Sequence, residues 1–122
     1  MTMTNPKSAL ANTSKSTKLA VLDEYRQILA SNPNDFTTMF KYGVLLYEMD
    51  QFQEAAETLD NIIQKKPNEL IVYDYAGKAL NHIGQHDKAI SALKAGLQKH
   101  PSATSLIQEL ATSYLQKGDI EQ

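Results

Sequence analysis

The sequence predicts an all-α fold built from a helix pair that repeats along the 122-residue chain. Three observations lead to this prediction. Prolines recur every 34 residues, at Pro33, Pro67 and Pro101. Small residues and large apolar residues return at the same spacing. Within each period the apolar residues fall at i, i+3, i+4 and i+7, which is the spacing of one face of an α-helix.

Positions that differ by 34 residues form columns, and the columns hold without the prolines. The small-residue column contains Gly43, Gly77 and Ala111. Three columns of large apolar residues are Met39–Tyr73–Ile107, Leu46–Leu80–Tyr114 and Tyr25–Leu59–Leu93. A turn column contains Asp50, Gly84 and Gly118. Agreement across so many columns indicates a true internal repeat.

The first segment, residues 1–15, is rich in Thr, Ser and Asn. Residues 1–22 contain three lysines and no acidic residue. A segment with so few large apolar groups buries too little surface to offset its ordering entropy, so we expect a flexible basic tail. A lone helix over about 16–31 follows, and with its proline loop it forms a half unit, 16–35.

Two complete units, 36–69 and 70–103, each consist of a helix, a turn, a second helix and a proline-marked loop. Asn34 and Asn68 follow the prolines and are expected to cap the next helix. Gly84 accepts a positive φ at the inner turn, and Asp50 must do the same in the earlier unit at some strain. A last half unit, 104–122, predicts a first helix over 104–117 and a turn at Gly118.

The chain resembles the tetratricopeptide repeat, a 34-residue antiparallel helix pair, over roughly residues 16–122. The best-matched stretches are Met39–Tyr42–Gly43–Leu46 with Ala55–Leu59–Ile62–Pro67, and Tyr73–Ala76–Gly77–Leu80 with Ala89–Leu93–Gly96–Pro101. The resemblance implies a right-handed α-solenoid of about two full repeats flanked by single helices. The last helix either closes the array or exposes an apolar face to a partner or to further repeats.

Composition and motifs argue against an enzyme. The chain has no cysteine, its five glycines form no phosphate-binding loop, and no serine lies in a nucleophile motif. His82 and His86 are four residues apart, but Gly84 breaks their shared face, so we expect no metal and no cofactor. A net charge of -2 gives no reason to expect nucleic acid binding, and no apolar run is long enough for membrane insertion. We expect a cytoplasmic protein, and organelle targeting by the basic tail stays open.

The resemblance implies a concave groove, lined by the first helix of each unit, that binds a peptide or a helix of another protein. The residues it places there are Thr37, Phe40, Val44, Tyr47, Ile71, Asp74, Lys78, Asn81, His82, Gln108 and Thr112. The helix at 36–49 is apolar nearly all round, which favours an apolar docking site at Phe40, Val44 and Tyr47. The alternatives are that residues 9–11 of the tail fold back over these side chains, or that the exposure is ordinary.

The resemblance also excludes one class of partner. Related domains that hold the EEVD tails of heat-shock chaperones clamp the terminal carboxylate with Lys, Asn and Arg. The matching positions here are Phe40, Val44, Tyr75, Ser105 and Glu109, so such tails are not expected as ligands. The leading hypothesis is therefore an adaptor or scaffold that binds protein. A self-associating structural scaffold (a homo-oligomer) and a chaperone for a secreted or aggregation-prone client are the alternatives.

Overall fold

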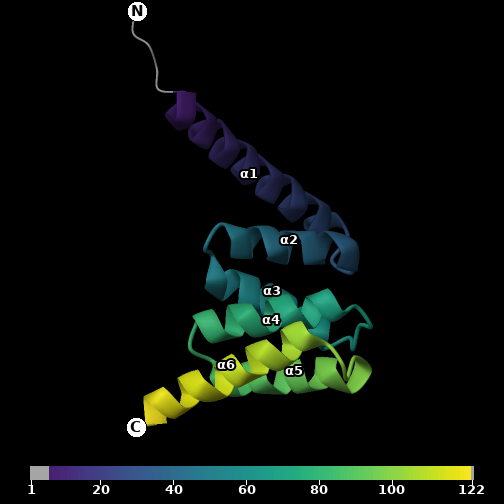
Figure 1. Ribbon diagram of the computed structural model, residues 1–122. Helices are drawn as coiled ribbons and strands as arrows, with labels where there is room; N and C mark the ends of the chain where they lie inside the picture. The colour runs from purple at the N-terminus through teal and green to yellow at the C-terminus, as the bar shows by residue number, and fades with distance from the viewer. Residues whose placement is uncertain (1–5, 122) are drawn as a thin grey trace, which may run out of the picture.

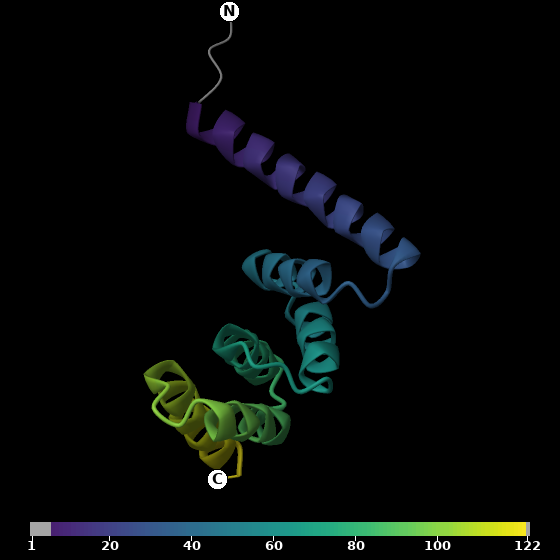
Figure 2. The same ribbon diagram turned by 90° about the vertical axis from the view of Figure 1, so that its right-hand side faces the viewer.

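A computed structural model describes residues 6–121 of the chain, with side chains over residues 15–118, and this part is helical without any strand. The six helices are α1 (Pro6–Ser31), α2 (Phe36–Glu48), α3 (Phe52–Ile63), α4 (Leu70–His82), α5 (His86–Lys99) and α6 (Thr104–Glu121). Each helix packs on the one before it, and α4 also contacts α2 and α6. Figure 1 shows α2 to α6 stacked on one another, and both views show α1 leading away from the stack toward its N-terminal end (Figure 2). The all-α fold of repeated helix pairs is confirmed.

Close approach of the paired helices follows from the small-residue column. Gly43 and Gly77 lie directly under leucines of the following helix, and a Cβ added to Gly77 would lie 2.5 Å from Leu93 Cδ2. At Gly43 the same construction comes within 3.0 Å of Leu59 Cδ2. Both leucines are fully buried. The core is therefore a series of pairwise contacts along the stack, as expected for a repeat protein.

The inner turns have the backbone that the sequence predicts. Gly84 has a φ of 76°, and Asp50 has a φ of 61°, which confirms that this aspartate adopts the left-handed conformation. The predicted caps are wrong by one residue. Asp35 caps α2, because its Oδ1 accepts a hydrogen bond of 3.1 Å from the Thr38 amide, and Glu69 precedes α4 without a side-chain cap.

The two outer helices extend beyond the expected boundaries. α1 begins at Pro6 rather than near residue 16, because proline suits the first position of a helix and no glycine or proline follows before Pro33. Residues 1–5 of the predicted tail lie outside the described residues. α6 continues through Gly118, so the predicted turn there is wrong. A glycine inside a helix costs only about 1 kcal/mol, and no atom near Gly118 forces the chain to turn.

Two polar clusters connect helices that are distant in the sequence. The Tyr42 hydroxyl donates a hydrogen bond to Glu54 and accepts one of 3.0 Å from Arg26 Nε, which ties α1 to α2 and α3. Burial is the main cause that raises the pKa of Tyr42, so the phenol stays protonated and able to donate. The side chain of Arg26 thus positions the C-terminal half of α1 on the stack.

The second cluster, which we call the polar junction, joins α4, α5 and α6 through one buried amide. Asn81 Nδ2 donates to Ser113 Oγ at 2.8 Å and to Glu109 Oε1 at 3.0 Å. Asn81 Oδ1 lies 2.9 Å from His86 Nδ1. Every polar atom of the amide side chain is therefore partnered, as buried polar groups require.

Candidate functional site

An aromatic cluster forms where the first helices of the two complete repeats meet. Its members are Phe40 and Tyr47 of α2, Phe52 of α3, and Tyr75 and His82 of α4. The ring of Tyr47 lies at the centre, with centroid distances of 5.3 Å to Phe52 and 5.6 Å to both Tyr75 and His82. These contacts are edge-to-face, whereas Phe52 and His82 stack at 4.0 Å. Such geometries suit the quadrupoles of aromatic rings.

The aromatic cluster is only partly covered. Its four Phe and Tyr side chains are half-buried, and His82 is exposed. Burial raises the pKa of Tyr47, so its phenol is neutral. Half-buried rings with polar tips offer apolar contact area at a small cost in conformational entropy, which is typical of protein interfaces.

One ion pair lies beside the aromatic cluster on α4. Lys78 Nζ is 3.1 Å from Asp74 Oδ2 and 5.9 Å from the centroid of Tyr75. Hydrogen bonding to Asp74 is the main cause that raises the pKa of Lys78, so the ammonium stays charged. The two charges cancel, so this pair gives the site no net attraction for an anion. Asp74 Oδ1 is buried and has no hydrogen-bond partner in the part of the chain that the structure describes.

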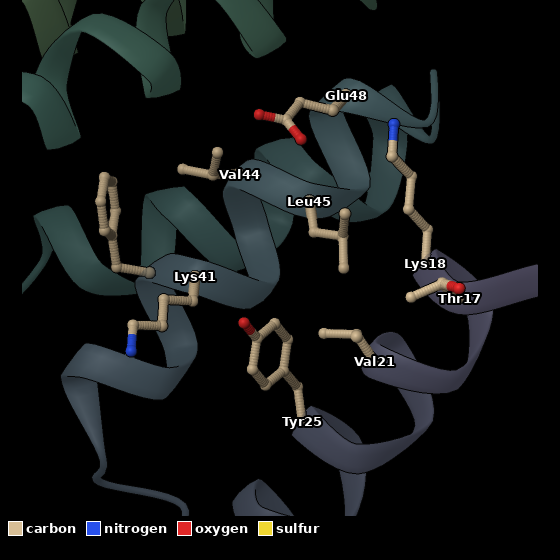
Figure 3. A pocket seen from close by; sticks show the side chains of 9 residues that line it. Thr17, Lys18, Val21, Tyr25, Lys41, Val44, Leu45 and Glu48 are labelled. Carbon is tan, nitrogen blue, oxygen red and sulfur yellow. The ribbon is translucent and has the colours of Figure 1, made fainter. Parts of the chain in front are cut away.

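Two cavities flank the aromatic cluster. The first, about 370 Å³, lies between the N-terminal ends of α2 and α4 and is lined by Phe36, Thr37, Phe40, Ile62, Lys65, Pro67, Glu69, Ile71 and Val72. The second, about 320 Å³, lies between α1 and α2 and is lined by Thr17, Lys18, Val21, Tyr25, Phe40, Lys41, Val44, Leu45 and Glu48. Figure 3 shows Val21 and Tyr25 reaching from α1 toward Leu45 of α2.

The structure brings together five of the residues predicted to line a groove, namely Phe40, Tyr47, Asp74, Lys78 and His82. Thr37 and Ile71 line the first cavity and Val44 lines the second. That these residues bind a partner stays a prediction.

The remaining predicted residues lie apart from the aromatic cluster. Asn81 is 8% exposed and its amide is used in the polar junction, so its placement in an open groove is wrong. On α6 the Thr112 hydroxyl donates to the Gln108 carbonyl at 3.1 Å, and Gln108 is exposed.

Sequence reasoning missed Phe52 and Tyr75 as members of the site. A usable signal existed for Tyr75, because its column otherwise contains the charged residues Lys41 and Glu109. An aromatic residue at a position that is polar in the other repeats marks a local role.

The described residues contain no group of three or more His, Asp or Glu side chains placed to hold a metal ion. His82 stacks on Phe52, and His86 is buried in the polar junction. Between residues 6 and 121, no helix has both the length and the apolar content to cross a membrane.

Comparison with known sequences identifies the repeat. The sequence model of the tetratricopeptide repeat matches residues 37–69, which correspond to α2 and α3 with the loop that follows. BBSome complex member BBS4 of Bos taurus is 29% identical over 99 residues, which cover 81% of this chain and 19% of that protein. Anaphase-promoting complex subunit 3 of Dictyostelium discoideum is 29% identical over 86 residues, which cover 70% of this chain and 9% of that protein.

Solved structures with a similar fold include two of MamA. One crystal structure of MamA has a TM-score of 0.79 at 19% identity and covers 97% of this chain and 67% of that chain. MamA from Desulfovibrio magneticus RS-1, residues 41 to the end, has a TM-score of 0.75 at 23% identity and covers 91% and 62%. At this level of identity the likeness is one of fold.

Proposed function

Since the chain belongs to the tetratricopeptide-repeat family, we propose that it is a scaffold module that binds another protein at the aromatic cluster. The observation that carries this proposal is the set of half-buried rings contributed by α2, α3 and α4. The names of both curated relatives describe members of multi-protein complexes, which supports a role in protein assembly.

The chemistry of the site favours an apolar or amphipathic segment as the partner. Aromatic edges and faces contact aliphatic or aromatic side chains well. The single ion pair beside the rings is already neutralised, so a strongly acidic peptide gains little there.

The test compares proteins captured by the 122-residue chain with those captured by the double variant Tyr47→Ser, Tyr75→Ser. Capture should be lost, while the far-UV circular dichroism stays helical. Asn61→Ser with Gln98→Ser, two exposed positions on α3 and α5, is the matched control and should capture normally.

His82→Ser is a milder variant, because His82 is exposed and its removal leaves the tyrosines packed. It should weaken capture severalfold without a change in helicity. If both cluster variants retain the partners of the unmodified chain, the aromatic cluster is not the binding site.

A further inference from the structure

One face of α6 is uncovered although its equivalents are core. Ile107 and Tyr114 are 49% and 47% exposed. The equivalent residues of α4, Tyr73 and Leu80, are 1% and 3% exposed because α5 covers them. Ala111 lies between Ile107 and Tyr114, in the small-residue column, and is also exposed. In α2 and α4 this face is covered by the second helix of the same repeat. In α6 the same face is exposed among the side chains that the structure describes.

The column that contains Tyr47, Asn81 and Leu115 also loses its usual contact at α6. In the first complete repeat, Tyr47 of this column contacts Tyr75 of the next repeat. In the second, Asn81 bonds to Ser113 of α6. The column thus contacts the first helix of the following repeat in both cases. Leu115 is 71% exposed, the largest value among the large hydrophobic side chains of residues 15–118.

The cavity between α1 and α2 has the complementary form. Three rings surround Tyr47, namely Phe52, Tyr75 and His82. Their equivalents one period earlier are Lys18, Lys41 and Glu48, and all three line this cavity. A helix placed in this cavity would therefore lie against α1 and α2 in the same way that α2 lies against α3 and α4. Phe40 is among its apolar lining residues. The others are Val21, Tyr25, Val44 and Leu45, which Figure 3 labels.

We propose that α6 of one copy docks in the cavity between α1 and α2 of a second copy, so that two chains form one complete helix pair. In this arrangement Leu115 enters the cavity near Leu45, and Tyr25 of the second copy lies over Ala111. That contact reproduces Leu59 over Gly43 and Leu93 over Gly77 within the chain.

A second copy fits better than an unrelated partner, because the same repeat register generates both surfaces. α6 packs on α5 of the preceding repeat, but the second helix of its own repeat is not among the described residues. Likewise, α1 packs on α2 of the following repeat, but the first helix of its own repeat is not among the described residues. The proposed contact between two copies repeats the packing of α2 against α3 and α4 within one chain. Because the two surfaces differ, the contact is head-to-tail and leads to rings or open filaments. The cavity shares only Phe40 with the aromatic cluster and does not include Tyr47 or Tyr75.

Disulfide trapping tests this contact directly, because the chain contains no cysteine. Tyr25→Cys and Ala111→Cys are made in separate copies, mixed and oxidised. A disulfide between the two copies is expected, since cysteines can bridge only when their Cα atoms lie within about 7 Å. Gln27→Cys, an exposed residue on the other side of α1, replaces Tyr25→Cys as the matched control and should not cross-link to Ala111→Cys.

Light scattering at high micromolar concentration gives an independent readout that leaves α1 unchanged. Leu115→Lys should weaken association at least tenfold, because Lys18 and Lys41 line the cavity, and Gln98→Lys, at an exposed position on α5, should not. Three results would overturn the proposal: a monomeric unmodified chain, unchanged association of Leu115→Lys, or a disulfide of Ala111→Cys with itself as efficient as with Tyr25→Cys. The tyrosine variants of the aromatic cluster should associate normally, which separates this contact from the proposed function.

Discussion

Asp50, Gly84 and Gly118 occupy equivalent positions in the repeat, but their backbone conformations differ. Alanine should therefore have opposite effects on stability at the two glycines. At Gly84 φ is 76°, and placing a Cβ in this left-handed region costs about 1–2 kcal/mol. At Gly118 the chain is helical and an added Cβ meets nothing within 4 Å. Alanine there should gain up to about 1 kcal/mol of helix propensity, and the gain should be smaller because Gly118 lies in the last turn of α6.

Urea unfolding of the whole chain, followed by circular dichroism, measures both effects. With a slope of about 2 kcal/mol/M, Gly84→Ala should lower the midpoint by about 0.5–1 M, and Gly118→Ala should raise it by up to about 0.5 M. Asp50→Gly is the third member of the series and should raise the midpoint, because it relieves the left-handed aspartate. A loss for Gly118→Ala as large as that for Gly84→Ala would mean that the chain turns at Gly118, and would refute the continuous α6.

Two further predictions concern packing and pH. Gly77→Ala should lower the free energy of unfolding by about 1–2 kcal/mol, because its Cβ would lie 2.5 Å from Leu93 Cδ2 in a closed core, and overpacking outweighs helix propensity. An unchanged urea midpoint, with Gly118→Ala measured alongside, would contradict this. The Thr38 amide hydrogen bond holds the pKa of Asp35 below its usual value of about 3.9, so the stabilisation is present above about pH 4 and is lost as pH falls through the lower, folded-state pKa. Asp35→Asn should therefore be less stable than the unmodified chain near neutral pH and approach it in acid, and a gap independent of pH would contradict the assignment.

Most of the fold could be predicted from the sequence, because the same residue types return at the same helix-packing positions every 34 residues. Gly43 and Gly77 indicate close helix contacts, and the turn at Gly84 is a local property of one residue. The errors arose at Pro6 and Gly118, where a local signal for disorder or for a turn competes with helix continuation. At Gly118 the outcome depends on a difference of about 1 kcal/mol, and no atom lies within 4 Å of an added Cβ to decide it.

The site was harder to predict because column positions show where a side chain points and not what it meets. Asn81 and Tyr47 share a column, yet the amide is buried in hydrogen bonds and the ring belongs to the aromatic cluster. Tyr75 was missed because its role depends on Tyr47 and Phe40 of another repeat. Contacts between repeats depend on pairs of residues, and a single column contains only one member of each pair.

The polar junction has a consequence for the order of the units in the chain. The boundary between α2 and α4 is made of rings, whereas the boundary between α4 and α6 is made of an amide, a hydroxyl and a carboxylate. If residues 70–103 were duplicated in tandem, Asn81 of the first copy would face Tyr75 and Ala79 of the second in place of Glu109 and Ser113. Asn81 Oδ1 would keep His86, but the Nδ2 group would lose both of its acceptors. A buried donor without an acceptor costs about 1–3 kcal/mol, so the duplicated array would be destabilised at its new boundary. Units that look alike by their period are therefore not interchangeable, because the polar junction favours a following helix that supplies acceptors for Asn81.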